Sequence, residues 1–339
     1  MGSGSNNSTT LEDLAKLSGV SASTVSRALN DHPSISTRTK QRIWALAKEH
    51  DYPFRRYMPA GPIGSEGSIA IVTPRTHGRP LPLSHPFFLE LLASIGEAAR
   101  DRGCDFTVSH TAPASFDDLF AAATTSRANG VIFLGQSNLH EAFNQLADTD
   151  ARFAVWGAQM QGQKYCSIGS DNLLGGRRAT LHLARLGRKR IVFLGETEPE
   201  ALQRRAGYLE ALKESGLDAD PALICPVDFE LESAEAAVNS LVRRKTPFDS
   251  IFASSDLIAL GAIRALLHAN LSVPGDVSVI GYDNVPFSRY SRPALSTISQ
   301  DTAKAGRLMV SKLLDGSGQG VGRSERVPTD LIIRESCGG

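Results

Sequence analysis

Side chains suited to contacts with nucleic acid gather in the first thirty residues of the sequence. Arg27 lies in a stretch with helical character, and its guanidinium can pair with a guanine edge or clamp a phosphate. Ser21 and Thr24 stand near the start of that stretch, where hydroxyl groups can bind backbone phosphates. The small or polar side chains that allow close approach to DNA are Ala22, Ser23 and Ser26. These residue types indicate binding chemistry rather than catalysis.

A second group of candidate side chains stands at the ends of predicted strands. Asp283 follows an apolar run, and a carboxylate there points into the crevice where open α/β sheets bind ligands. It can accept hydrogen bonds from two vicinal hydroxyls, while a guanidinium such as that of Arg204 donates to others. Trp156 ends one strand-like run and Phe229 follows another, so either ring could stack on a sugar. A turn-capping role for Asp283 and a core position for Trp156 are the structural alternatives.

Sequence signatures of catalysis and of metal binding are absent. The sequence contains no His-Glu-x-x-His, no Walker loop and no Gly-x-Ser-x-Gly. Its four cysteines form no Cys-x-x-Cys pair, which fits neither a structural zinc site nor a dense disulfide framework. We therefore expect a protein that is not an enzyme and uses no cofactor or metal. Free thiols and the lack of a visible secretory signal predict a cytoplasmic location.

The length and composition are those of a globular protein with two or three compact units. The chain has 339 residues, of which 41% are hydrophobic and 21% charged, and this excludes a wholly disordered protein. No apolar run approaches the roughly 18 residues that cross a bilayer, so we expect no membrane partner. The 36 basic and 36 acidic side chains cancel and exclude a polycation. Residues 1–58 nevertheless hold eight basic and five acidic side chains, a balance that suits attraction to phosphates.

Three short helices are predicted to carry the first group of side chains. The first spans about 11–17 after the N-cap candidate Thr10, the second follows Ser21 and runs to about residue 29, and the third spans about 36–50. Two short helices joined by a Gly-containing turn make a helix-turn-helix, whose second helix fits the major groove of DNA. The core that the helices would share is Leu14, Ala15, Val20, Val25, Leu29, Ile43, Leu46 and Ala47.

From about residue 68 the pattern changes to alternating strands and helices. The predicted strands are Ile69–Thr73, Asp105–Ser109, Gly130–Leu134, Phe153–Trp156, Arg190–Leu194, Ser250–Ala253 and Val277–Gly281. The clearest amphipathic helices between them are Phe88–Arg102, Leu173–Leu186 and Ala201–Ser215. Buried strands that alternate with helices specify a parallel, doubly wound sheet, here long enough for two lobes.

The N-terminal residues follow the pattern T-x-x-D-[VI]-A-x-x-A-G-V-S-x-x-T-V-S-R-x-x-N. The corresponding positions are Thr10, Asp13, Leu14, Ala15, Ser18, Gly19, Val20, Ser21, Thr24, Val25, Ser26, Arg27 and Asn30, of which Leu14 and Ser18 differ from the pattern. This segment resembles the DNA-binding headpiece of the LacI/GalR (lac-repressor) family of bacterial transcription regulators, and the similarity continues to about residue 335. The resemblance implies that Ala22, Ser23 and Arg27 read bases, and it adds Thr10 and Asn30 to the DNA-binding set.

The resemblance implies a homodimer on a pseudo-palindromic, double-stranded DNA operator, and it also implies the domain order. We expect an arm or expression remnant at 1–8, an all-α helix-turn-helix headpiece at 9–53, a hinge or linker at 54–67, and a two-lobed, periplasmic-binding-protein-like α/β domain at 68–339 for effector binding and dimerisation. The N-lobe would take about 68–166 with 300–325. The C-lobe would take about 167–299 with 326–336.

The hinge departs from the family pattern. Family members place an Asn-x-x-Ala-Arg-x-Leu helix here, whose leucine enters the minor groove. In this sequence Pro59 and Pro62 oppose a continued helix, and no leucine stands at the inserting position. Arg55 and Arg56 can still neutralise phosphates, and Met58 is the candidate for the leucine's place.

The resemblance assigns ligand-binding roles in the effector region as well. Phe87 and Phe88 lie where the family places ligand contacts, Arg204 matches the arginine of R-x-x-G-[FY], and Asp283 matches the aspartate of G-[FY]-D. The remaining residues assigned in this way are Asp171, Ser255, Asp256 and Gln300. Three alternatives stay open: Asp171 as a helix N-cap, Phe88 as a core residue, and Gln300 at the dimer interface.

We therefore expect a sequence-specific DNA-binding transcription regulator, a repressor, whose operator affinity is controlled by a carbohydrate effector. A purine or nucleoside effector on the same architecture is the first alternative. A solute-binding protein that feeds a transporter is the second, since the α/β part alone would serve. An enzyme on a similar scaffold is the third, and it would need a catalytic set that the sequence does not display.

Overall fold

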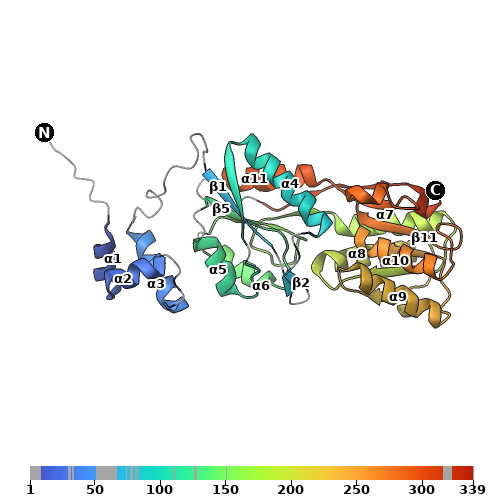
Figure 1. The fold of residues 1–339 in the computed structure, drawn as a ribbon, viewed down its shortest axis with the longest axis horizontal. Helices are drawn as coiled ribbons and strands as arrows, with labels where there is room; N and C mark the ends of the chain where they lie inside the picture. Colours follow the sequence, from blue (N-terminus) through green and yellow to red (C-terminus); the bar gives the residue numbers. More distant parts are fainter. Residues whose placement is uncertain are drawn as a thin grey trace.

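The computed structural model describes residues 9–29, 32, 34–50, 67–73, 75–76, 79–80, 82, 84–109, 111–125, 128–149, 151–315 and 323–338. Its first part is a unit of three helices, α1 (Leu11–Ser18), α2 (Ala22–Leu29) and α3 (Thr37–Glu49) (Figure 1). The buried side chains of this unit are Leu14, Val25, Ala28, Leu29, Ile43 and Ala47. The predicted core is confirmed for five of these, while Ala15, Val20 and Leu46 pack at its edge.

Local hydrogen bonds explain where the two helices of the helix-turn-helix begin and end. The Thr10 hydroxyl accepts from the Asp13 backbone N–H at 3.2 Å, and the Asp13 carboxylate accepts from the Thr10 N–H at 2.9 Å, which makes a capping box. Gly19, with φ at +67°, ends α1 in the left-handed conformation that favours glycine. The Ser21 hydroxyl then accepts from the Thr24 N–H at 3.2 Å and starts α2.

Residues 67–338 form two α/β lobes, each built on a six-stranded sheet (Figure 1). The first sheet has the order β13-β7-β6-β5-β1-β4, and all of its pairs are parallel. Its strands are β1 (Gly67–Val72), β4 (Cys104–Ser109), β5 (Gly130–Phe133), β6 (Phe153–Trp156), β7 (Ser167–Ser170) and β13 (Glu325–Val327). A short antiparallel pair, β2 (Arg75–Thr76) and β3 (Arg79–Pro80), follows β1.

The second sheet has the order β14-β12-β11-β10-β8-β9, and only its β12–β14 pair is antiparallel. Its strands are β8 (Ile191–Gly195), β9 (Ile224–Pro226), β10 (Ser250–Ala253), β11 (Ser278–Asp283), β12 (Ser296–Gln300) and β14 (Thr329–Ile332). The chain therefore enters the second lobe after β7 and passes between the lobes again after β12 and between β13 and β14.

Helices cover both faces of each sheet, which is why the central strands are buried throughout. In the first lobe these helices are α4 (Pro86–Asp101), α5 (Phe116–Thr125), α6 (His140–Ala147) and α11 (Thr302–Asp315). In the second lobe they are α7 (Asn172–Arg185), α8 (Pro199–Glu214), α9 (Leu231–Arg243) and α10 (Asp256–His268). Three short 3-10 turns complete the lobe, at Pro221–Leu223, Pro286–Arg289 and Glu335–Cys337.

The predicted two-lobed α/β fold is confirmed, and the exact crossing points between lobes differ from those expected. β7 pairs with β6 and β13, so the first lobe extends to Ser170 rather than ending at about 166. β13 also belongs to the first lobe, which moves the last crossing to about residue 328. The expected lobe boundaries missed these two strands because neither has a strong apolar pattern in its sequence. In the sheet, β13 lies at the edge and pairs with β7, and β7 pairs with β13 and β6.

Within the part of the chain that the structure describes, no helix is long and apolar enough to span a bilayer. The same residues contain no group of three or more His, Cys, Asp or Glu side chains arranged to hold a metal ion.

Candidate functional site

The exposed face of α2 carries the polar side chains that the sequence pointed to. Ser21, Ser23 and Arg27 are exposed, whereas Ala22, Thr24 and Ser26 are partly buried. The Ser21 hydroxyl lies 2.9 Å from the hydroxyls of both Ser23 and Thr24. A cluster of hydroxyls therefore stands at the positive end of a helix dipole, an arrangement that suits phosphate oxygens.

Two qualifications apply to the predicted DNA-binding residues. The hydroxyl of Thr10 serves the capping box of α1, so its role in this structure is to start that helix. Four other predicted residues lie outside the described part of the chain, namely Asn30, Arg55, Arg56 and Met58.

A pocket lies where the two lobes meet, at the carboxyl ends of their strands. Its walls include segments that follow β1, β5 and β6 in the first lobe and β8 and β11 in the second. The lining residues are Arg75, Phe87, Phe88, Gly135, Gln136, Ser137, Trp156, Glu196, Glu198, Glu200, Ala201, Arg204, Phe229 and Asp283. This is the position at which open α/β sheets bind ligands.

Six of the ten predicted ligand-binding residues line this pocket. They are Phe87, Phe88, Trp156, Arg204, Phe229 and Asp283. The rings of Phe87 and Trp156 are 5.7 Å apart and are buried in the core of the first lobe, so both serve as core and as pocket wall. Arg204 is 7% exposed and lines the pocket, whereas the next residue, Arg205, is only partly buried and is not among the lining residues.

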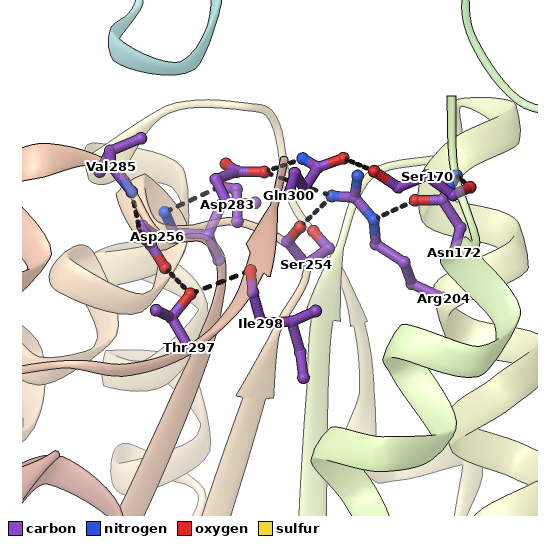
Figure 2. Close-up of polar contacts among 12 residues, drawn as sticks. Ser170, Asn172, Arg204, Ser254, Asp256, Asp283, Val285, Thr297, Ile298 and Gln300 are labelled. Carbon is purple, nitrogen blue, oxygen red and sulfur yellow. Dashed lines mark hydrogen bonds and ion pairs between the residues drawn. The ribbon is translucent and has the colours of Figure 1, made fainter. Parts of the chain in front are cut away.

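Arg204 is held by neighbours on every side (Figure 2). Its Nε donates to Asn172 Oδ1 at 2.9 Å, and its Nη1 donates to the backbone oxygen of Ser254. The guanidinium also lies 3.7 Å from the ring centre of Tyr282 and 4.0 Å from Asp283 Oδ1. These contacts fix its orientation, because a buried guanidinium needs both charge compensation and hydrogen bonds.

Asp283 is the buried carboxylate at the end of β11. Its backbone has a φ of +115°, which residues other than glycine rarely adopt. Such strained conformations occur most often at functional sites. Gln300 donates to its Oδ1 at 2.6 Å, and Ser170 in turn donates to Gln300 at 2.5 Å (Figure 2). Burial raises the pKa of Asp283 well above its usual value, and the positive charge of Arg204 partly opposes that shift.

Two other predicted ligand residues, Ser255 and Asp256, bind groups of the protein in this structure. Both are fully buried and neither lines the pocket. The Ser255 hydroxyl caps α10 by accepting from the Ile258 N–H at 3.2 Å. The Asp256 carboxylate turns back into the lobe, where it accepts from the Val285 N–H at 2.9 Å and from the Thr297 hydroxyl at 2.5 Å.

The last two predicted ligand residues, Asp171 and Gln300, also lie outside the pocket wall. Asp171 is the N-cap of α7 and accepts from the Leu174 N–H at 3.0 Å, which was the alternative weighed for it. Gln300 lies one layer behind the wall and orients Asp283. Neither side chain is part of the pocket wall, and Gln300 reaches it through Asp283.

Sequence reasoning missed eight lining residues, among them Gln136, Glu196, Glu198 and Glu200. Gln136 follows the end of β5, and the three glutamates follow the end of β8. The strand-end rule that identified Asp283 applies equally to these residues and would have found them.

An aromatic contact joins the two lobes beside the pocket. His85, the residue before α4, stacks on Phe229 of the second lobe with ring centres 4.0 Å apart and planes 17° apart. Phe88 packs edge-on against His85 at 5.5 Å. Burial lowers the pKa of His85 to about 4, so this ring is neutral at pH 7.

Comparisons with known proteins agree with this geometry. A family model described as bacterial regulatory proteins of the lacI family matches residues 10–53, and one described as a periplasmic binding protein-like domain matches residues 180–337. The chain belongs to the LacI family. As a LacI-family member, it is a DNA-binding transcriptional regulator controlled by an effector, and it is not an enzyme.

Full-length relatives within the LacI family are similar to this chain from end to end. The transcriptional regulator MalR of Clostridium butyricum is 28% identical over 337 residues, which cover 96% of this chain and 98% of MalR. The structure of a complex of the regulator CelR with cellobiose is 26% identical, covers 97% of this chain and 99% of CelR, and gives a TM-score of 0.68. The lac repressor dimer bound to operator and an anti-inducer is 25% identical, with coverages of 97% and 99% and a TM-score of 0.69.

Proposed function

We propose that this LacI-family regulator is a repressor that binds its operator as a homodimer in the cytoplasm and that a carbohydrate controls its DNA affinity. The observation that carries the effector class is the combination of ring faces and hydrogen-bonding groups in one pocket. Phe88, Trp156 and Phe229 offer apolar faces on which the C–H face of a sugar ring can stack. Asp283 and the neighbouring glutamates offer carboxylate oxygens for hydroxyl groups.

The complex of CelR with cellobiose supports the same proposal, because that relative is similar to this chain over nearly its whole length. The pocket of this chain adds a physical reason. A sugar presents many hydroxyls, and a site whose buried polar groups are left unpaired rejects ligands that lack such groups.

For DNA, we propose that α2 enters the major groove with Ala22, Ser23 and Arg27 toward the bases. Ser21 and Thr24 would bind phosphate oxygens at the start of the helix, and the small side chain of Ser26 would allow close approach to DNA. The exposed position of Arg27 and the hydroxyl cluster around Ser21 support this assignment. The predicted contribution of Asn30, Arg55, Arg56 and Met58 remains part of the proposal.

Exposed apolar side chains support dimerisation through the α/β domain. In the first lobe, Leu89 of α4 and Phe106 and Val108 of the edge strand β4 are 37–47% exposed. Phe106 lies against Gly96 of α4, which makes α4 and β4 one surface. In the second lobe Tyr290 is 77% exposed, an unusual position for a large aromatic side chain unless a partner covers it.

Both lobes contribute to the pocket, and this supports a mechanism of effector control. A ligand that contacts both walls favours the arrangement in which they are close. A change in that arrangement moves the first lobe, which the chain joins to the headpiece, and so alters the spacing of two headpieces on the operator.

A gel-shift titration tests this proposal with DNA that the full-length protein selects from a random library. We expect a matching sugar to change the operator affinity at least about tenfold. Asp283→Ala should retain operator binding and lose the response, whereas the exposed-site control Asp218→Ala should keep both. The proposal is wrong if no sugar changes operator affinity, and a response to purines alone would replace the carbohydrate with the alternative effector.

A further inference from the structure

The pocket between the lobes contains more acidic than basic side chains. Glu196, Glu198 and Glu200 follow the end of β8, and Asp283 ends β11. Among the described lining residues the basic ones are Arg75 and Arg204. Four carboxyl groups against two guanidinium groups leave a formal excess of two negative charges in a site for a small molecule.

The Arg204 guanidinium already binds groups of the protein. Its Nε and Nη1 donate to Asn172 and to the backbone oxygen of Ser254, and the group lies over the Tyr282 ring. Arg75 differs, because its Nε is buried and has no hydrogen-bond partner among the described residues. Arg75 therefore has a buried donor left for a ligand.

A buried acceptor next to the glutamates points to a ligand rich in donors. Gln136 is 1% exposed and lines the pocket. Its Nε2 donates to the Ala158 backbone oxygen at 2.7 Å and to the Tyr165 hydroxyl at 2.6 Å. Its Oε1 is buried without a hydrogen-bond partner in the described structure. A buried acceptor left unpaired is costly, so this oxygen marks a position for a donor.

Glu200 and Gln136 both contact the backbone of Ala158. The Ala158 N–H binds the Glu200 carboxylate, and the Ala158 oxygen accepts from Gln136, so one residue links the two side chains. Glu196 accepts from the Ser254 hydroxyl at 2.6 Å. Burial raises the pKa of both Glu196 and Glu200, which means that their charged forms lack sufficient compensation from the protein.

We propose that the effector carries a protonated amine in addition to hydroxyl groups and is an amino sugar whose amine is not acylated. An ammonium group has three donors and no acceptor, which matches the carboxylates and the Gln136 oxygen. It also offsets the excess negative charge, and the aromatic walls favour a cation. Arg75 donates to a hydroxyl of the same ligand. This inference rests on the proposed carbohydrate control.

Isothermal titration calorimetry of the full-length protein tests the inference with three matched pairs: glucosamine and glucose, galactosamine and galactose, and mannosamine and mannose. We expect one amino sugar to bind at least about tenfold more tightly than its parent at pH 7. N-acetylation of that sugar should remove the preference.

Variants separate the acidic pocket from general damage. Glu196→Gln and Glu200→Gln keep the shape of each side chain and should each reduce the preference for the amino sugar by about tenfold. Glu210→Gln, an exposed substitution on the same helix α8, should leave it unchanged.

Two different failures are distinguishable. The amine inference is overturned, and carbohydrate control stands, if a parent sugar binds as tightly as its amino partner or if the glutamine variants keep the preference. Carbohydrate control fails as well if no member of any pair binds and none alters operator affinity in the gel shift.

Discussion

Asp256 and Asp283 are both buried carboxylates that follow strands of the second lobe, but they bind different groups. Asp283 faces the pocket between the lobes, whereas Asp256 binds the Val285 N–H and the Thr297 hydroxyl inside the lobe. The Asp256 carboxylate also approaches so near to Gly281 that a side chain there would overlap it. Asp256 therefore ties the start of α10 to the strands β11 and β12.

Replacement of Asp256 by alanine should destabilise the protein by about 2–4 kcal/mol, because it leaves the Val285 N–H and the Thr297 hydroxyl buried without an acceptor. Urea unfolding monitored by circular dichroism measures the change. Asp218→Ala, at an exposed position, should shift the free energy of unfolding by less than about 0.5 kcal/mol. Equal effects of the two substitutions would refute a structural role for Asp256.

The different roles of these residues show what a sequence can and cannot predict about a site. The strand-end rule points to Asp283, which lines the pocket, and it applies to Glu196, Glu198 and Glu200 as well. It cannot separate Asp256 from Asp283, because both follow buried strands and differ only in which way the backbone turns. The backbone of Asp283 has a φ of +115°, which turns its carboxylate toward the pocket, and no feature of the sequence predicts that conformation.

At the scale of elements, the crossing of α7 and α8 determines where Arg204 lies. A Cβ at Gly207 of α8 would overlap the Leu173 carbonyl oxygen, and one at Gly176 of α7 would overlap the Arg204 carbonyl oxygen. Only glycine permits helix backbones to approach this closely. The close approach brings Asn172, the first residue of α7, within 2.9 Å of the Arg204 guanidinium. Gly176 and Gly207 therefore serve the site through packing.

Gly207→Ala should push α8 away from α7 and cost about 1–3 kcal/mol of stability, since the added methyl group meets backbone atoms that cannot move alone. Displacement of Arg204 should weaken effector binding at the same time. Thermal unfolding and calorimetric titration measure the two effects. Glu210→Ala, exposed on the same helix, should change neither, and a Gly207→Ala protein with unaltered stability would show that the helices can separate without cost.

Elements with strong periodicity were predicted well, and short edge elements were not. All seven predicted strands exist. Most of them are apolar runs that are buried in the structure, and β4, at the edge of the first sheet, is the exposed one. The strands β7, β12, β13 and β14 are only three to five residues long and contain polar side chains. Their pairing depends on partners far along the chain. Local composition does not contain that information.

At the scale of the whole molecule, the two lobes touch through an aromatic stack as well as through the pocket. His85 of the first lobe lies on Phe229 of the second, with both ring nitrogens buried and without hydrogen-bond partners among the described residues. A charged imidazole in that position would be costly, which is why burial lowers the pKa of His85 to about 4. The neutral ring thus stabilises the arrangement in which the lobes are close.

Acid should therefore separate the lobes through His85. When the lobes part, His85 becomes accessible to water and its pKa returns toward about 6.5, so the open arrangement binds a proton that the closed one excludes. The stability of the closed arrangement is complete above about pH 6.5 and falls as the pH drops from about 6.5 to about 4. Small-angle X-ray scattering should show a radius of gyration that rises over this range.

The control for this prediction is a variant at position 85. The pocket glutamates have raised pKa values, so acid favours the closed arrangement through them. The decisive comparison is therefore with His85→Phe, which keeps the stack and cannot titrate. That variant should stay closed under conditions where the wild-type protein opens; identical scattering profiles for the two proteins would show that His85 does not control the contact between the lobes.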